Sequence, residues 1–115
     1  MWIPDIIAFV PRSVKVAAVE HFGPGKRKKV FVRDRRIAVF NDTGKFYAVD
    51  DTCTHVGGSL SEGLCEDGII TCPWHSAQFR LSDGRGIGEH AYRSLVTYPI
   101  SVKNGVVEVE IGDLI

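Results

Sequence analysis

The hydrophobic positions fall into short runs separated by turn residues, a pattern typical of β-strands rather than helices. A valine-rich run at 14–19 predicts the first strand. The runs 30–32 and 37–40 flank a charged segment and predict a β-hairpin, and 46–49 predicts a third strand after the turn at 41–44. No segment of twelve or more residues carries the apolar stripe of an amphipathic helix. The pattern therefore predicts an all-β fold.

The second half of the chain continues this pattern with two strong turn signals. Asp67-Gly68 and Asn104-Gly105 each lie between apolar runs and predict two-residue hairpins. The glycine-rich segment 84–94 is expected to be a flexible connection. The strands expected here are 64–65, 69–71, 78–81, 96–102 and 106–111.

Length and charge narrow the class of protein. The chain has 115 residues, enough for one domain with a buried core. It has 14 basic and 14 acidic residues, so its overall charge indicates neither nucleic acid nor an anionic membrane as a partner. The basic run Lys26 to Lys29 predicts a solvated turn, and docking of an acidic electron donor is the alternative.

Residues 1–11 are mostly apolar, but Pro4, Asp5 and Pro11 interrupt them. The run is too short to cross a bilayer and lacks the basic start of a signal peptide, so we expect no membrane span. An edge strand or packed arm is the favoured interpretation, and a partner or self-association surface is the alternative.

Two Cys-and-His pairs form the chemically most informative pattern. Cys53-x-His55 is followed, after sixteen residues, by Cys72-x-x-His75. Each pair presents one thiolate and one imidazole from a short loop, which indicates a metal site. A structural zinc site is the alternative, although zinc fingers usually place a cysteine pair in one knuckle and a histidine pair on a helix.

These two loops resemble those of the Rieske iron–sulfur family, through both the ligand spacing and the segments Cys53-Thr-His-Val-Gly-Gly and Cys72-Pro-Trp-His. The resemblance covers roughly residues 12–112. It implies one [2Fe-2S] cluster per chain, with Cys53 and Cys72 on the buried iron and His55 and His75 on the outer iron.

The resemblance also implies an architecture. Residues 1–115 are expected to form a single Rieske domain, a framework of antiparallel sheets or a partly open barrel. A cluster-binding subdomain at about 45–85 would be inserted in it, with 1–11 as an apolar N-terminal arm. Gly57 and Gly58 are expected to permit a tight turn after His55 and to bring backbone N–H groups near sulfur. An apolar collar is expected around the histidines, formed by Val56, Leu60, Pro73 and Trp74.

The chain departs from the high-potential branch of that family. That branch has an extra cysteine in each loop and two hydroxyl side chains after the second histidine. Here Gly58 and Trp74 replace the cysteines, and Ala77 and Phe79 replace the hydroxyl residues. Ser76 replaces a glycine common in the family, and its hydroxyl is expected to offset part of this loss. Fewer hydrogen-bond donors stabilise the reduced cluster less, so we expect a potential at the low end of the Rieske range.

The function that the resemblance implies is one-electron transfer by a carrier that is not itself an enzyme. The expected partners are a flavin-dependent reductase and a terminal oxygenase, and the alternative is the small subunit of an NADH-dependent nitrite reductase. With Cys53 and Cys72 as ligands, Cys65 has no disulfide partner, which fits a reducing, cytoplasmic location. His21 and His90 are expected to be surface residues.

Overall fold

The computed structural model describes residues 13–32, 34–54, 57–74, 77–88 and 93–111. The N-terminal run 1–11, His90 and the two predicted histidine ligands lie outside these residues. The elements, in order, are β1 (Ser13–Ala18), η1 (Val19–His21), β2 (Arg27–Val32), β3 (Arg35–Asp42), β4 (Lys45–Asp50), η2 (Leu60–Glu62), β5 (Leu64–Glu66), β6 (Ile69–Thr71), β7 (Gln78–Arg80), β8 (Gly86–Ile87), β9 (Thr97–Tyr98), β10 (Ile100–Lys103) and β11 (Val106–Glu110).

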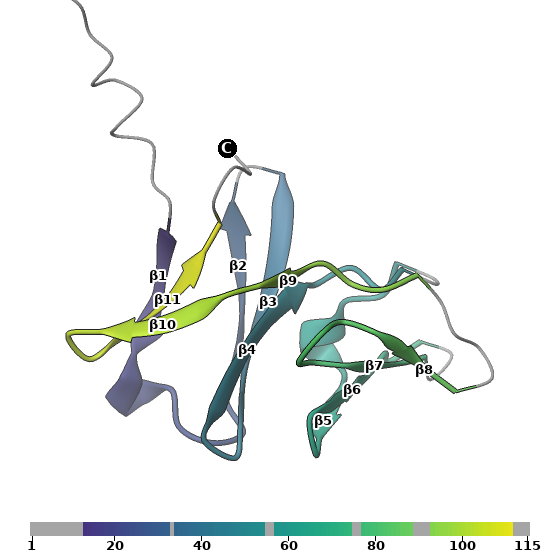
Figure 1. The fold of residues 1–115 in the computed structure, drawn as a ribbon, viewed down its shortest axis with the longest axis horizontal. Coiled ribbons are helices and arrows are strands. Elements are labelled where there is room, and N and C mark those ends of the chain that lie inside the picture. Colours follow the sequence, from purple (N-terminus) through teal and green to yellow (C-terminus); the bar gives the residue numbers. More distant parts are fainter. Residues whose placement is uncertain (1–12, 33, 55–56, 75–76, 89–92, 112–115) are drawn as a thin grey trace, which may run out of the picture.

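The described strands form three antiparallel sheets, which Figure 1 shows side by side. The first has the order β1-β11-β10, the second β2-β3-β4-β9, and the third β5-β6-β7-β8. No α-helix occurs in the described part of the chain. The expected all-β fold with antiparallel sheets is confirmed, and the sheets do not close into a barrel.

Strand β3 belongs to two hydrophobic cores at once. Ile37 and Val39 pack in the core against the first sheet, whereas Ala38 and Phe40 pack in the core that contains the cysteine loops. All four side chains are at most 1% exposed. Successive side chains of a strand point to opposite faces, so an unbroken apolar run is the pattern of a strand covered on both faces. The second sheet is therefore the middle layer of the fold.

Both predicted two-residue hairpin turns are confirmed. Asp67 and Gly68 join β5 to β6 with φ angles of 53° and 77°. Asn104 and Gly105 join β10 to β11 with φ angles of 52° and 76°. A positive φ at both central residues is the requirement of a type I′ turn, which matches the twist of the flanking strands.

Two expectations about strand boundaries were wrong. The expected strand 96–102 is divided at Pro99 into β9, which pairs with β4, and β10, which pairs with β11. Proline has no N–H to donate to a ladder, so the chain passes from one sheet to another there. The glycine-rich segment 84–94 is not simply a connection, because β8 pairs within it with β7.

Candidate metal centre

The first cysteine loop leaves β4 and is closed by backbone hydrogen bonds. Cys53 N donates to Gly58 O and Gly57 N donates to Cys53 O, both at 2.9 Å. An isolated bridge between Thr52 and Ser59 closes the base of the loop. Gly57 has a φ of +77°, as expected for the tight turn. Cys53 is thereby held at 2% exposure.

The second cysteine loop leaves β6 in the same way. Cys72 N donates to Ala77 O at 2.7 Å, which closes this loop, and Cys72 is also 2% exposed. Trp74 N donates to the Cys72 sulfur at 3.4 Å. The indole of Trp74 remains 56% exposed, so an apolar surface lies next to a buried sulfur.

The fold brings the two loops together. The Cys53 and Cys72 side chains share a hydrogen bond, although they are nineteen positions apart in the sequence. Gly58 packs directly on the second loop: a Cβ there would lie 3.0 Å from the Cys72 sulfur and 3.3 Å from the Trp74 ring. Gly58 therefore permits close approach of the two loops, and its position next to a sulfur agrees with the expectation that the backbone there lies near sulfur.

This arrangement fits an iron–sulfur cluster on the cysteine side. Two thiolates bound to one iron must lie next to each other, and the fold already holds these two thiols in contact. Burial raises the pKa of the Cys72 thiol, and the Trp74 N–H partly opposes that effect. The N–H is thus already positioned to stabilise negative charge on the sulfur. Among the described residues no group of three or more metal-ligating side chains occurs, and two of the four predicted ligands lie outside them.

Two adjacent aspartates anchor the first loop at its root. Asp50 accepts hydrogen bonds from Tyr98 Oη at 2.5 Å and from Arg35 Nη1 at 3.1 Å. Burial, and then the hydrogen bond to Asp50, raises the pKa of the Tyr98 phenol well above its usual value. This network ties the end of β4 to β9 and β3, directly before the loop begins.

Asp51 faces the other way and is fully buried at 0% exposure. Its carboxylate accepts hydrogen bonds from Ser59 Oγ at 2.6 Å and Ser61 N at 2.7 Å. Lys29 Nζ lies 3.5 Å from the same carboxylate. The role of both aspartates was missed in the sequence, although the acidic pair that ends two residues before Cys53 was the available signal.

The basic run is not a solvated turn, and that expectation was wrong. Arg27, Lys28 and Lys29 lie at the start of β2, and the side chain of each contacts the chain. Arg27 Nη1 donates to the carbonyls of Gly63 and, at 3.3 Å, of Ser61. Lys28 Nζ donates to Val16 O at 2.8 Å. Alternating β-strand geometry sends Arg27 and Lys29 toward the cysteine loops and Lys28 toward β1.

The expected apolar collar around the histidines stays a prediction, because both histidines lie outside the described residues. Pro73 and Trp74 are exposed. Leu60 is 0% exposed and belongs to the core that contains both cysteines, so it supports the loop from within. Val56 lies outside the described residues. Cys65, a half-buried residue of β5, packs against that same core, and His21 is exposed, both as expected.

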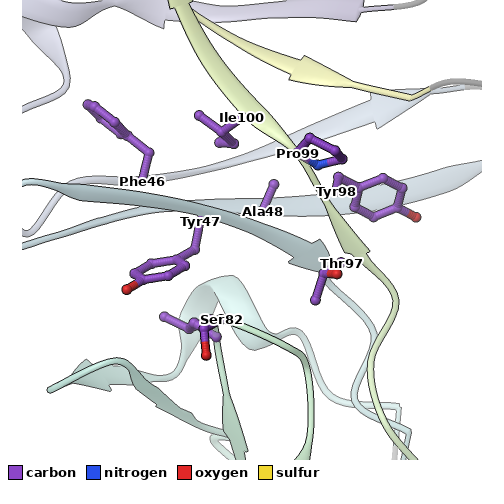
Figure 2. Close-up of a pocket in the computed structure, with 9 residues that line it drawn as sticks. Phe46, Tyr47, Ala48, Ser82, Thr97, Tyr98, Pro99 and Ile100 are labelled. Carbon is purple, nitrogen blue, oxygen red and sulfur yellow. The ribbon is translucent and has the colours of Figure 1, made fainter.

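A groove of about 370 Å³ opens between the middle sheet and the turn after β7. Figure 2 shows Tyr47 of β4 on one side of it and Ser82 on the other. Neither Cys53 nor Cys72 lines this groove. Its lining consists of Phe46, Tyr47, Ala48, Leu81, Ser82, Thr97, Tyr98, Pro99 and Ile100.

Comparison with known families identifies the class of protein that this fold and site define. Residues 12–99 match the Rieske [2Fe-2S] domain, and the chain belongs to this family. The matched segment includes all four predicted ligands. The domain carries one [2Fe-2S] cluster, so the zinc alternative is not retained.

Similar proteins narrow the class further. The chain is 39% identical over 100 residues to the 3-phenylpropionate/cinnamic acid dioxygenase ferredoxin subunit of Photorhabdus laumondii, covering 85% of this chain and 93% of the relative. It is 41% identical over 78 residues to the ferredoxin subunit of the same name from Escherichia coli K12, covering 67% and 74% of the two chains.

Solved structures show the same likeness. A chain in the complex of reduced oxygenase and oxidised ferredoxin of carbazole 1,9a-dioxygenase matches with a TM-score of 0.83 and 31% identity, over 90% of this chain and 97% of that chain. A Mycobacterium tuberculosis chain assigned as the small subunit of an NADH-dependent nitrite reductase matches with a TM-score of 0.75 and 26% identity, over 84% and 92%.

The protein is therefore an electron carrier of the Rieske type, and the expectation that it is not itself an enzyme is confirmed by these relatives. None of the described residues lies in a helix with the length and apolar character needed to cross a membrane.

Proposed function

We propose that Cys53 and Cys72 bind one iron of the cluster and that His55 and His75 bind the other. The support is the contact between the two buried cysteines, together with a Cys-and-His pair in each of two loops. Neutral imidazoles in place of two thiolates reduce the negative charge of the cluster, which takes up and releases one electron when bound.

The residues around the cysteines define how the site is used. The closed loops and the buried position of both thiols exclude water from that side. Trp74 N–H stabilises charge on the Cys72 sulfur. The exposed Trp74 indole, next in sequence to His75, offers an apolar contact for a redox partner, and such encounters are usually small and transient.

The cluster-binding part is proposed to comprise roughly residues 45–85 of a single domain. The support is that both cysteine loops and most of the separate β5–β8 sheet fall in this range. Shared packing on β3 and β4 argues for one domain, because Ala38, Phe40 and Val49 belong to the core of the cysteine loops.

The proposed physiological role is that of the ferredoxin component of a ring-hydroxylating dioxygenase. It would receive electrons from a flavin-dependent reductase and pass them to a terminal oxygenase in the cytoplasm. The relatives named as dioxygenase ferredoxin subunits carry this proposal, and the match to a chain of an oxygenase–ferredoxin complex supports it. The cytoplasmic location rests on cysteine usage, because Cys65 has no disulfide partner once the other two cysteines act as ligands.

The ligand proposal is tested by EPR of the dithionite-reduced protein. Cys72→Ala is expected to abolish the Rieske signal, and His55→Cys to abolish or alter it. Cys65→Ser is the matched control and is expected to leave the signal unchanged. A control variant that loses its colour, or a wild-type protein with stoichiometric zinc and no labile sulfide, would contradict the assignment.

The partner proposal is tested by mixing the reduced protein with a purified ring-hydroxylating oxygenase and following oxidation of the cluster by stopped flow. Rapid oxidation without a stable complex on size exclusion is expected. A stable complex with the catalytic subunit of a nitrite reductase, and no transfer to the oxygenase, would instead favour the role suggested by the nitrite reductase match.

A further inference from the structure

A partly buried ion pair joins the middle sheet to the first cysteine loop. Asp51 has a side chain that is 1% exposed, and Lys29 of β2 has one that is 26% exposed. Their charged atoms lie 3.5 Å apart. A pair of this kind is only weakly screened by salt, because solvent has little access to it.

Every neighbour recorded around the Asp51 carboxylate is a donor or a cation. Ser61 N donates to Oδ1, and Ser59 Oγ donates to Oδ2, which also faces the Lys29 ammonium. The carboxylate therefore holds the returning strand of the loop in place while carrying a negative charge. Leu60 N additionally donates to the Asp51 carbonyl at 2.7 Å.

The pair is close to the proposed cluster. Asp51 is two residues before Cys53, so their Cα atoms lie at most about 7 Å apart. Asp51 and Cys53 are both buried, at 0% and 2% exposure. At such a distance in a poorly solvated region, a single charge changes the energy of adding an electron.

We propose that Asp51 and Lys29 are positioning residues that also set the reduction potential of the centre, in opposite directions. The negative charge of Asp51 disfavours the added electron and lowers the potential, whereas the positive charge of Lys29 favours the electron and raises it. The inference rests on the ligand set proposed above. The charges of Asp51 and Lys29 would then together determine how readily the chain accepts an electron.

The neighbouring residue Lys28 provides a matched control. It has the same charge and lies on the same strand, but its ammonium donates to Val16 O on the opposite side of β2. Replacing either lysine changes the net charge of the protein equally. A difference between the two variants therefore reports the location of the charge.

The test is an EPR-monitored redox titration of the intact protein at pH 8. Asp51→Asn is expected to raise the midpoint potential and Lys29→Met to lower it, whereas Lys28→Met is expected to leave it close to the wild type. Lys29→Arg keeps the positive charge and is expected to have the wild-type midpoint potential. If the pair had only a structural role, Asp51→Asn and Lys29→Met would shift the midpoint potential in the same direction, or would change the EPR line shape without shifts of opposite sign.

Shifts of the same sign, or equal shifts from Lys28→Met and Lys29→Met, would overturn the inference. If Asp51→Asn does not fold, the comparison of the two lysine variants and the arginine replacement decides the question. A wild-type protein without a Rieske signal would overturn the ligand set itself, which separates that failure from the failure of this inference.

Discussion

At the scale of single residues, the contact between Gly58 and the second loop shows how little space surrounds the cysteines. The Gly58 backbone faces both the Cys72 sulfur and the Trp74 ring. The high-potential branch of the family places cysteines at the positions of Gly58 and Trp74. Here Gly58 and the Trp74 ring lie next to each other at these positions.

Gly58→Ala is expected to reduce cluster occupancy, because its Cβ would lie 3.0 Å from the Cys72 sulfur and 3.3 Å from the Trp74 ring. The ratio of iron to protein after purification, with the visible spectrum, measures the effect. Gly23→Ala is the control, since a Cβ there would meet no atom within 4 Å. Equal occupancy in both variants would show that the Trp74 ring moves aside freely.

Tyr98 is expected to make the fold sensitive to alkali. The pKa of its phenol is raised in the folded protein, by burial first and then by Asp50. An unfolded tyrosine ionises near pH 10, so the stabilisation is present below that pH and is lost as the pH rises further. Denaturant unfolding between about pH 9 and pH 11.5 is expected to show this loss in the wild type and a smaller loss in Tyr98→Phe. An equal loss of unfolding free energy with pH in the two proteins would contradict this role of Tyr98.

At the scale of elements, β2 connects the framework to the cluster-binding part. Its side chains at alternate positions reach both ends of the first loop: Arg27 contacts Ser61 and Gly63 after the loop, and Lys29 contacts Asp51 before it. The Arg27 guanidinium also lies 5.5 Å from the centre of the Phe40 ring. Arg27, Lys28 and Lys29 of the basic run are therefore structural, and their charged groups have partners within the fold.

Arg27→Met is expected to lower the free energy of unfolding by about 1.5–3 kcal/mol, because it removes charged hydrogen bonds to two carbonyls, one of them on buried Gly63. Chemical denaturation of the intact protein measures this change. Arg80→Met is the comparison variant, since Arg80 pairs with the exposed Asp83 and such pairs contribute little. If Arg27→Met lowers the free energy of unfolding no more than Arg80→Met does, a structural role for Arg27 is refuted.

At the scale of the whole molecule, β3 makes one structural unit of the framework and the cluster-binding part. Its two faces belong to different cores, so disturbing either core is transmitted to the same strand. The Asp50 network adds a second connection, from the end of β4 to β9. The loops that hold the cysteines are thus supported by residues from nearly the whole described chain.

The reduction potential is a property of this whole environment, and we expect it at the low end of the range from about −150 to about +300 mV known for Rieske centres. Ala77 and Phe79 carry no hydroxyl, and both are buried at 5% and 0% exposure. A redox titration is expected to give a midpoint well below about +200 mV. A higher value would mean that other donors replace the missing hydroxyl groups.

The sequence by itself was sufficient for most of the strands, the two hairpin turns and the pattern of candidate cysteine and histidine ligands. These features follow from local rules: alternation of side chains, positive φ at Asp-Gly and Asn-Gly, and the spacing within each loop. They require only residues that are close together in the chain.

Only the tertiary structure decided where the basic run points, that Pro99 moves the chain between sheets, and which aspartate meets Lys29. Lys29 and Asp51 are 22 residues apart, and Asp50 and Tyr98 are 48 apart. Contacts at such separations depend on how strands pair and stack, which no local pattern encodes. For this reason the proposed ligands could be named from the sequence, whereas the charged residues near Cys53 could not.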